Sequence, residues 1–155
     1  MIRGAATENG PSEDRPDLAA MVAPLGRALI AAELPILRAN DLSMWAYAVL
    51  LHLDEQPLRT QAALADAIGA DRTRIIAVLD DLERRGLIHR QADPGDRRAR
   101  LLSITAEGRQ RRDVARSAIR DHEERLLTRL TPAERRGFLS ALRTLHALAP
   151  TEITG

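Results

Sequence analysis

Apolar side chains recur at steps of three and four residues along most of the chain, which is the pattern of helices that bury one face. The first such stripe runs from Leu18 to Ile36. Pro24 and Pro35 lie within it. Because proline removes a backbone donor and crowds the preceding turn, we expect this first helix to be kinked or broken.

Three shorter helices are predicted next, each after a residue whose side-chain oxygen can cap a helix. Ser43 precedes a strongly apolar segment, Thr60 precedes a short segment that stops at Gly69, and Asp71 precedes a segment that closes at Gly86. Glycine directly after a helix is typical of the position where the backbone turns left-handed. The spacing of these signals predicts a compact group of three helices.

A β-hairpin is predicted after the fourth helix. Residues 87–90 and 100–104 have the composition of short strands, and the segment Asp93-Pro94-Gly95-Asp96 between them is a strong turn signal. Three helices followed by such a hairpin are the arrangement of a winged helix-turn-helix, in which the hairpin is the wing.

Two further helices are predicted after the hairpin. One opens at Thr105, and the other follows Thr131, where a hydroxyl cap, Pro132 at the first helical position and Glu134 three residues after the cap form a capping-box pattern. A winged helix-turn-helix does not need these helices or the first one, and their apolar stripes require a partner. We therefore expect a homodimer.

The predicted fold class is mainly α with a small β-hairpin wing: a winged helix-turn-helix flanked by N- and C-terminal dimerisation helices. The predicted domains are a disordered tail at 1–17, a dimerisation helix at 18–41, a DNA-binding lobe at 42–104 and dimerisation helices at 105–149. The residues expected at the subunit interface are Leu25, Leu29, Ile119, Leu126, Leu130, Leu142 and Leu145.

Two stretches of the sequence resemble the MarR family of bacterial transcriptional regulators. One runs through residues 64–74 and 79–88, and the other is the hairpin segment 93–98 continuing to the sequence Ile-Thr-Ala-Glu-Gly at 104–108. The resemblance extends over residues 18–148, and the wing signature is its most specific part. It implies a dimeric, sequence-specific DNA-binding regulator, with repression as the expected mode.

The fourth helix and the wing hold the residues expected to contact DNA. A helix that begins at Asp71 presents free N–H groups to phosphate, and its first turn carries Arg72, Thr73 and Arg74 where a recognition helix meets base edges. Arg74 suits a two-pronged contact to guanine. The other residues expected at DNA are Arg59, ahead of the third helix, and Arg97, Arg98 and Arg100 of the wing.

Asp96 is expected to brace the wing, because a carboxylate repels phosphate but can hold Arg98 in one rotamer; the resemblance implies the same role. Three positions of the fourth helix depart from the family pattern: Ile76 and Ala77 stand where polar or basic residues are common, and Asp81 where a basic residue is frequent. Fewer side chains of the fourth helix are therefore available to read bases.

The resemblance also implies a small aromatic or phenolic ligand that binds between the dimer arms and the DNA-binding lobes and releases the DNA. The candidate ligand-binding residues, which would suit a planar anion, are Arg38, Trp45, Tyr47 and His52. The alternative is that Trp45 and Tyr47 are core or interface residues.

The charge distribution supports a polyanionic partner. All 23 basic residues are arginine and the formal net charge is only +1, but residues 71–112 hold 11 arginines against 7 carboxylates. The alternative function is a winged-helix protein–protein interaction module without sequence-specific DNA binding. The arginine-rich wing argues against it, because the cores of protein interfaces are depleted in charge.

Catalysis, metals and cofactors are not expected. The chain has no cysteine, and its four histidines have no spacing that would place two metal ligands on one helix face. No nucleophile elbow or phosphate-cradling glycine loop is present. The longest apolar run, residues 44–53, is too short to span a membrane and no signal peptide is apparent, so we expect a cytoplasmic protein.

Overall fold

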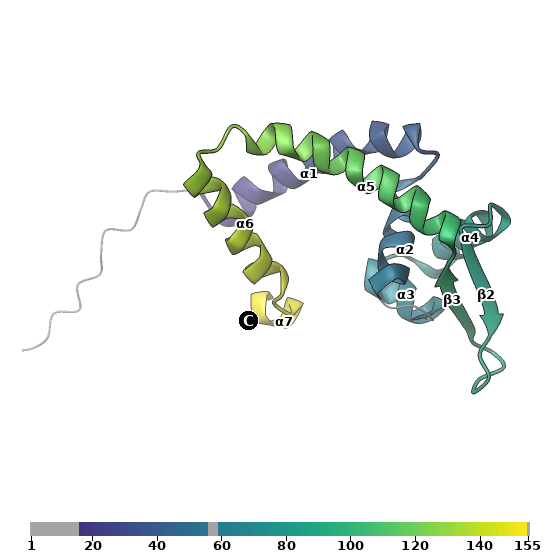
Figure 1. Cartoon of the computed structure of the whole chain (residues 1–155). Helices are drawn as coiled ribbons and strands as arrows, with labels where there is room; N and C mark the ends of the chain where they lie inside the picture. Colours follow the sequence, from purple (N-terminus) through teal and green to yellow (C-terminus); the bar gives the residue numbers. More distant parts are fainter. Residues whose placement is uncertain (1–15, 56–58, 155) are drawn as a thin grey trace, which may run out of the picture.

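The fold is an arch of helices with a small sheet at one end. The computed structural model describes residues 16–55 and 59–154, so the predicted tail lies almost wholly outside the described residues. Figure 1 shows two long helices side by side, with a lobe of short helices and strands below one end and two helices below the other. The helices are α1 (Leu18–Ala39), α2 (Met44–Glu55), α3 (Gln61–Ile68), α4 (Arg72–Arg84), α5 (Ala106–Leu127), α6 (Pro132–His146) and α7 (Pro150–Thr154).

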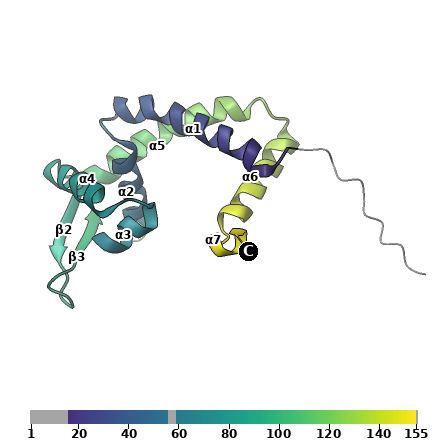
Figure 2. The ribbon, with the colours of Figure 1, turned by 180° about the vertical axis from the view of Figure 1, so that it is seen from behind.

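The first helix is not broken. α1 runs without interruption through Pro24 and Pro35, contrary to the expected break. A proline removes only one backbone donor, and hydrogen bonds from neighbouring turns continue the helix on both sides. In both ribbon views α1 lies along α5, which gives one flank of the helix a neighbour (Figures 1 and 2).

The helix starts follow the capping signals. The side chains of Thr60, Asp71, Thr105 and Thr131 each accept a hydrogen bond from a backbone N–H in the first turn of the helix that follows. Thr131 forms the full capping box, because the Glu134 carboxylate accepts a hydrogen bond from the backbone N–H of Thr131 over 2.8 Å. The Thr131 hydroxyl also donates to this carboxylate over 2.7 Å, and the two donated hydrogen bonds lower the pKa of Glu134. The predicted starts of these four helices are confirmed.

The hairpin is part of a three-stranded antiparallel sheet. β2 (Ile88–Ala92) and β3 (Arg100–Ile104) form the predicted wing, and β1 (Arg59–Thr60) pairs with the other edge of β3. Arg59 is opposite Leu102. The two residues of β1 are too few to give a strand pattern in the sequence, so this strand was not predicted.

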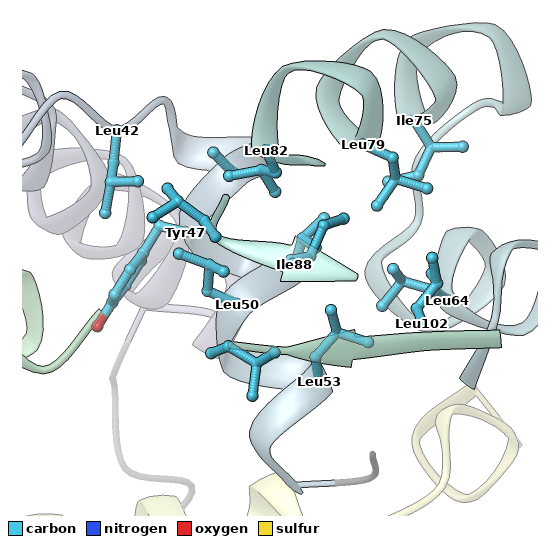
Figure 3. Packing of buried hydrophobic residues seen from close by; sticks show 14 of the residues in the cluster. Leu42, Tyr47, Leu50, Leu53, Leu64, Ile75, Leu79, Leu82, Ile88 and Leu102 are labelled. Carbon is cyan, nitrogen blue, oxygen red and sulfur yellow. The ribbon is translucent and has the colours of Figure 1, made fainter. Parts of the chain in front are cut away.

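The buried core joins the lobe to the long helices (Figure 3). Leu50, Leu64, Leu79 and Leu102 bring together α2, α3, α4 and β3. The same cluster also includes Leu37 from α1, and Ala115 and Ile119 from α5. The lobe predicted at 42–104 therefore shares its core with both flanking helices.

Large apolar residues remain exposed at the end of the arch that is distant from the lobe. α6 has no buried residue, although its apolar side chains Phe138, Leu142 and Leu145 recur at helical spacing. By length and mean hydropathy (1.5) α1 could also cross a membrane, with 6% of the stretch buried. Length and composition do not distinguish such a span from an apolar helix that a second protein surface covers. The sequence predicted α1 as a helix but not as a candidate span, because Arg27 and Glu33 interrupt its apolar run.

Candidate nucleic-acid interface

The N-terminus of α4 is fixed by Asp71. The Asp71 carboxylate accepts a hydrogen bond from the backbone N–H of Arg74 over 2.8 Å and lies 3.7 Å from the Arg74 Nε. Buried Ile75, Leu79 and Leu82 anchor the opposite face of the helix in the core. The first turn of α4 therefore meets solvent in a fixed orientation, with its backbone donors and positive dipole end exposed.

The three predicted contact residues of α4 occupy different flanks of the helix. At 100° per residue, Arg72 and Arg74 point about 160° apart, and Thr73 lies between them on the outermost face. Arg72 borders the cavity that separates α4 from the wing, whereas the Arg74 guanidinium lies over the ring of Trp45 in α2. All three side chains are exposed.

The wing loop is held by short-range hydrogen bonds. The Asp96 carboxylate accepts from the backbone N–H of Arg98 over 2.9 Å, and the Asp93 carboxylate accepts from the N–H of Gly95 over 2.7 Å. Asp96 thus braces the backbone of the loop; the contact expected from the sequence was with the Arg98 side chain. Arg97, Arg98 and Arg100 are exposed at the tip and on the returning strand.

A cavity of about 410 Å³ separates α4 from the wing. It brings together the predicted residues Arg72, Arg98 and Arg100, which are distant in sequence, with Asp96 at its edge. The remaining lining comes from the start of α3, from α4 and from the wing: Thr60, Gln61, Ala62, Ile75, Ile76 and Ala99. The backbone of Arg59 lies in β1 next to this cavity, but its side chain lies outside the described residues.

Arg90 connects the wing to α4. Its guanidinium forms ion pairs with Asp80 and Glu83 and donates from Nε to Glu83 over 2.8 Å. Burial alone would lower the pKa of Arg90, but hydrogen bonds to these two carboxylates raise it. These ion pairs fix the spacing between α4 and the wing, the two elements that carry the exposed arginines. They were not predicted from the sequence.

A second cavity, of about 360 Å³, lies between α1, α2 and α5. Tyr47 is the one predicted ligand residue that lines it. The other lining residues are Glu33, Met44, Ala48, Leu51, Arg116, Ile119, Arg120 and Glu123. Burial and the neighbouring Glu123 raise the pKa of Glu33, and burial is also the main cause that raises the pKa of the Tyr47 hydroxyl.

The other predicted ligand residues are not gathered at this cavity. Arg38 is exposed on the last turn of α1, and Trp45 contacts Arg74 on the other side of α2. His52 faces its own helix, with Nδ1 2.9 Å from the carbonyl oxygen of Ala48. The one-turn spacing of Arg116 and Arg120 is the sequence signal that could have identified the α5 wall.

The predicted interface residues divide into two groups. Leu25, Leu126, Leu142 and Leu145 are exposed, and Leu29 and Leu130 are half-buried. Ile119 is only 6% exposed and packs in the core of its own chain, so the structure corrects its assignment. The part of the α5 apolar stripe around Ile119 packs against α2. The apolar residues of α5 after Ile119 are available to another surface.

The helical triad α2–α4, the three-stranded sheet and the projecting wing define a winged helix-turn-helix protein. The model of the MarR family matches residues 40–99, which include α2, α3, α4 and β2 of this lobe. Together with the relatives described next, this match shows that the chain belongs to the MarR family of transcriptional regulators, which are regulators and not enzymes.

Two curated relatives are named as regulators. The chain is 31% identical over 105 residues to the transcriptional regulator HosA of Escherichia coli O111:H-, covering 68% of this chain and 78% of HosA. It is 34% identical over 100 residues to a putative transcriptional regulatory protein for the hcr operon of Thauera aromatica, a match that covers 64% of this chain but only 60% of that protein.

Solved structures share the fold over most of the chain. The transcriptional repressor CouR bound to a 23-mer DNA duplex is 32% identical, with a TM-score of 0.72, covering 84% of this chain and 92% of that chain. CouR from Rhodococcus jostii RHA1 bound to p-coumaroyl-CoA is 28% identical, with a TM-score of 0.68, covering 86% of this chain and 94% of that chain.

Proposed function

We propose that the protein is a homodimeric repressor that binds a pseudo-palindromic operator and acts in the cytoplasm. The observation that carries this proposal is the grouping of Arg72, Arg98 and Arg100 around one cavity beside the capped start of α4. A recognition helix in the major groove and an arginine-tipped wing in the adjacent minor groove would use all three side chains. CouR, which has the same architecture, is described as a DNA-bound repressor.

The dimer is supported by the apolar faces that the single chain leaves uncovered. They lie on α1, α5 and α6, at the end of the arch distant from the lobe (Figure 2). A two-fold axis there would pair the same faces of two copies and place two lobes side by side. Two recognition helices would then enter major grooves about one helical turn apart.

Binding should depend steeply on salt, and the wing should account for part of that dependence. We expect Arg98→Ala to weaken binding to many sequences and to reduce the slope of log K against log salt by about one unit for each subunit. The measurement is fluorescence anisotropy with a labelled duplex from the DNA upstream of the gene, between roughly 50 and 200 mM salt.

The matched control for Arg98→Ala is Arg136→Ala. Arg136 is also an exposed arginine and lies on α6, outside the lobe, so the variant loses the same charge. If both variants bind like the wild type, the wing assignment is wrong. Binding with flat salt dependence, or capture of a protein without any DNA binding, would favour the protein-interaction module.

We also propose that the cavity between α1, α2 and α5 binds a small aromatic or anionic effector that lowers DNA affinity. Arg116 and Arg120 offer positive charge on one wall, and Tyr47 remains a neutral hydroxyl donor because its pKa is raised. The cavity volume suits a single substituted ring. A ligand there would contact the lobe through α2 and the long helices through α1 and α5.

Effector binding should tighten at lower pH. The raised pKa of Glu33 means that its carboxyl group accepts a proton at a higher pH than an ordinary glutamate. Protonation removes a negative charge beside the ligand, so the affinity for an ionised aromatic acid should rise as pH falls through that pKa. Calorimetry with hydroxybenzoates at several pH values tests this, and Glu33→Gln should remove the pH dependence. An unchanged pH dependence in Glu33→Gln would exclude Glu33 as its source.

A further inference from the structure

The side-chain contact between the first turn of the recognition helix and α2 is made by Arg74, which lies over the ring of Trp45. The Arg74 guanidinium carbon lies 5.7 Å from the centroid of the Trp45 ring. Trp45 belongs to the first turn of α2, so the contact connects two different helices of the lobe. The sequence analysis assigned these two residues to separate sites, one for ligand and one for DNA.

The backbone at Trp45 is held in place by the residues that follow it in α2. Its neighbours Ala46 and Tyr47 are 3% and 7% exposed, which fixes the start of α2 against the rest of the lobe. Ser43 caps this turn by accepting a hydrogen bond from the N–H of Ala46 over 3.0 Å. The half-buried indole therefore projects from a fixed point of the backbone at the start of α2.

Arg74 is restrained from two directions. The Trp45 ring lies under its guanidinium, and the Asp71 carboxylate lies 3.7 Å from its Nε while also capping the helix backbone. The side chain nevertheless remains 57% exposed, so it stays accessible to DNA. An arginine held in this way loses less rotamer entropy when it binds than one that is free in solvent.

From this geometry we infer that Trp45 is a positioning residue for Arg74 in DNA recognition. It contacts no base itself; it holds the Arg74 guanidinium beside the first turn of α4, ready for a two-pronged contact. The inference rests on the proposed DNA-binding function. It gives Trp45 a role in specificity in place of the role in ligand binding that the sequence suggested.

The test is a double-mutant cycle on a duplex that the wild-type protein selects from a random-sequence pool. Trp45→Leu keeps an apolar side chain but removes the aromatic face, and we expect it to weaken binding to the selected duplex about two- to fivefold. Arg74→Ala should weaken it more, by about five- to 150-fold, and relax preference at one base position. In the Arg74→Ala background, adding Trp45→Leu should change affinity by less than about 1.5-fold.

Two controls separate positioning from a general loss of structure. Trp45→Phe retains an aromatic face and should bind more tightly than Trp45→Leu. Trp45 is the only tryptophan in the chain, so Arg74→Ala should also change the tryptophan emission of the DNA-free protein. Thermal melting of each variant shows whether the lobe is still folded.

The outcomes distinguish failure of this inference from failure of the proposed function. If the wild type enriches no sequence, the proposed DNA recognition fails and the inference falls with it. A second outcome is that the wild type binds while Trp45→Leu weakens binding by the same factor with and without Arg74. In that case Trp45 acts only through folding, and the inference alone is wrong. Tighter binding by Trp45→Leu would also overturn it, because Trp45 would then mask Arg74.

Discussion

Replacing Gly108 with alanine is expected to destabilise the folded lobe severely. A Cβ atom at this position would lie 2.1 Å from the carbonyl oxygen of Leu87 and 2.8 Å from Cγ1 of Ile104. The first contact is with backbone, so no rotamer change can relieve it. Either α5 or the chain at Leu87 must move.

The expected loss of stability is large because several hydrogen bonds form at the same contact between α5 and the chain at Leu87. Thr105 donates from its backbone N–H to Leu87 over 3.1 Å and from Oγ1 to the carbonyl oxygen of Gly86 over 2.7 Å, while Gly108 donates to Thr105 Oγ1 over 2.9 Å. Moving α5 stretches these bonds, at about 1–3 kcal/mol for each buried group left unsatisfied. We expect a loss of about 3 kcal/mol or more, which is a large part of the total stability of a domain.

The measurement is urea and thermal unfolding followed by circular dichroism. A loss of this size should lower the melting temperature by about 6–12 °C in a chain of this length. Gly137→Ala is the matched control, since a Cβ at Gly137 in α6 meets nothing within 4 Å and should stabilise the helix by about 0.5–1 kcal/mol. A Gly108→Ala protein that unfolds at the wild-type midpoint would contradict the close approach of α5 to Leu87.

The parts of the fold that the sequence predicts well are those set by neighbouring residues. Helix starts at Thr60, Asp71 and Thr131 depend on a side chain three residues from its partner, and such signals are visible in the sequence. The wing is similar, because its turn residues specify the reversal locally. The helix starts after Ser43, Thr60, Asp71, Thr105 and Thr131 and the hairpin are therefore placed correctly.

The parts that the sequence misses depend on contacts between distant segments. β1 is a strand only because Arg59 and Thr60 pair with Leu102 and Leu101. Ile119 lies on an apolar stripe of α5 that packs in the core of its own chain at Ile119 and is exposed further along. The periodicity of the stripe does not show where the packing within the chain ends. The residues of the α1–α2–α5 cavity come from three helices, and no local signal brings Glu33 close to Arg116.

A count of charges along the sequence is misleading because it does not show the ion pairs that form between distant segments. The sequence shows an excess of arginine in residues 71–112, but the structure uses part of it to hold the lobe together. Arg90 pairs with Asp80 and Glu83, and Arg85 pairs with Asp81 and donates to the carbonyl oxygen of Asp41 over 2.6 Å. The positive charge at the DNA-facing surface is therefore smaller than the count suggests, and it is concentrated on the wing and the start of α4.

The turn between α1 and α2, at Asp41, is held by two arginines that therefore have a structural role. Asp41 has a positive φ of 54°, an uncommon backbone conformation for a residue other than glycine. Besides Arg85, Arg111 of α5 lies 3.5 Å from the Asp41 carboxylate. Arg85, directly after α4, and Arg111 of α5 thus hold the turn between α1 and α2, which sets how the lobe is attached to the long helices.

Leu142→Arg on α6 is expected to dissociate the proposed dimer. In the single chain Leu142 is 45% exposed and α6 has no buried residue, so its apolar face has no function within one subunit. Burying a leucine at an interface stabilises by about 1.5–3 kcal/mol, and two-fold symmetry places the substitution in the interface twice. The loss of about 3–6 kcal/mol should raise the dimer dissociation constant at least about 100-fold.

Sedimentation equilibrium over a range of concentrations measures this change directly. Ser140→Arg is the matched control, because it adds the same charge to an exposed position of α6 on the side of the helix away from Leu142. It should leave the dissociation constant nearly unchanged. Since each lobe alone contacts only one half-site, the Leu142→Arg monomer should also lose most of its operator affinity while its melting curve shows an intact lobe. A Leu142→Arg protein that still sediments as a dimer would place the interface away from α6, and the apolar face of α1 would then be the surface that pairs.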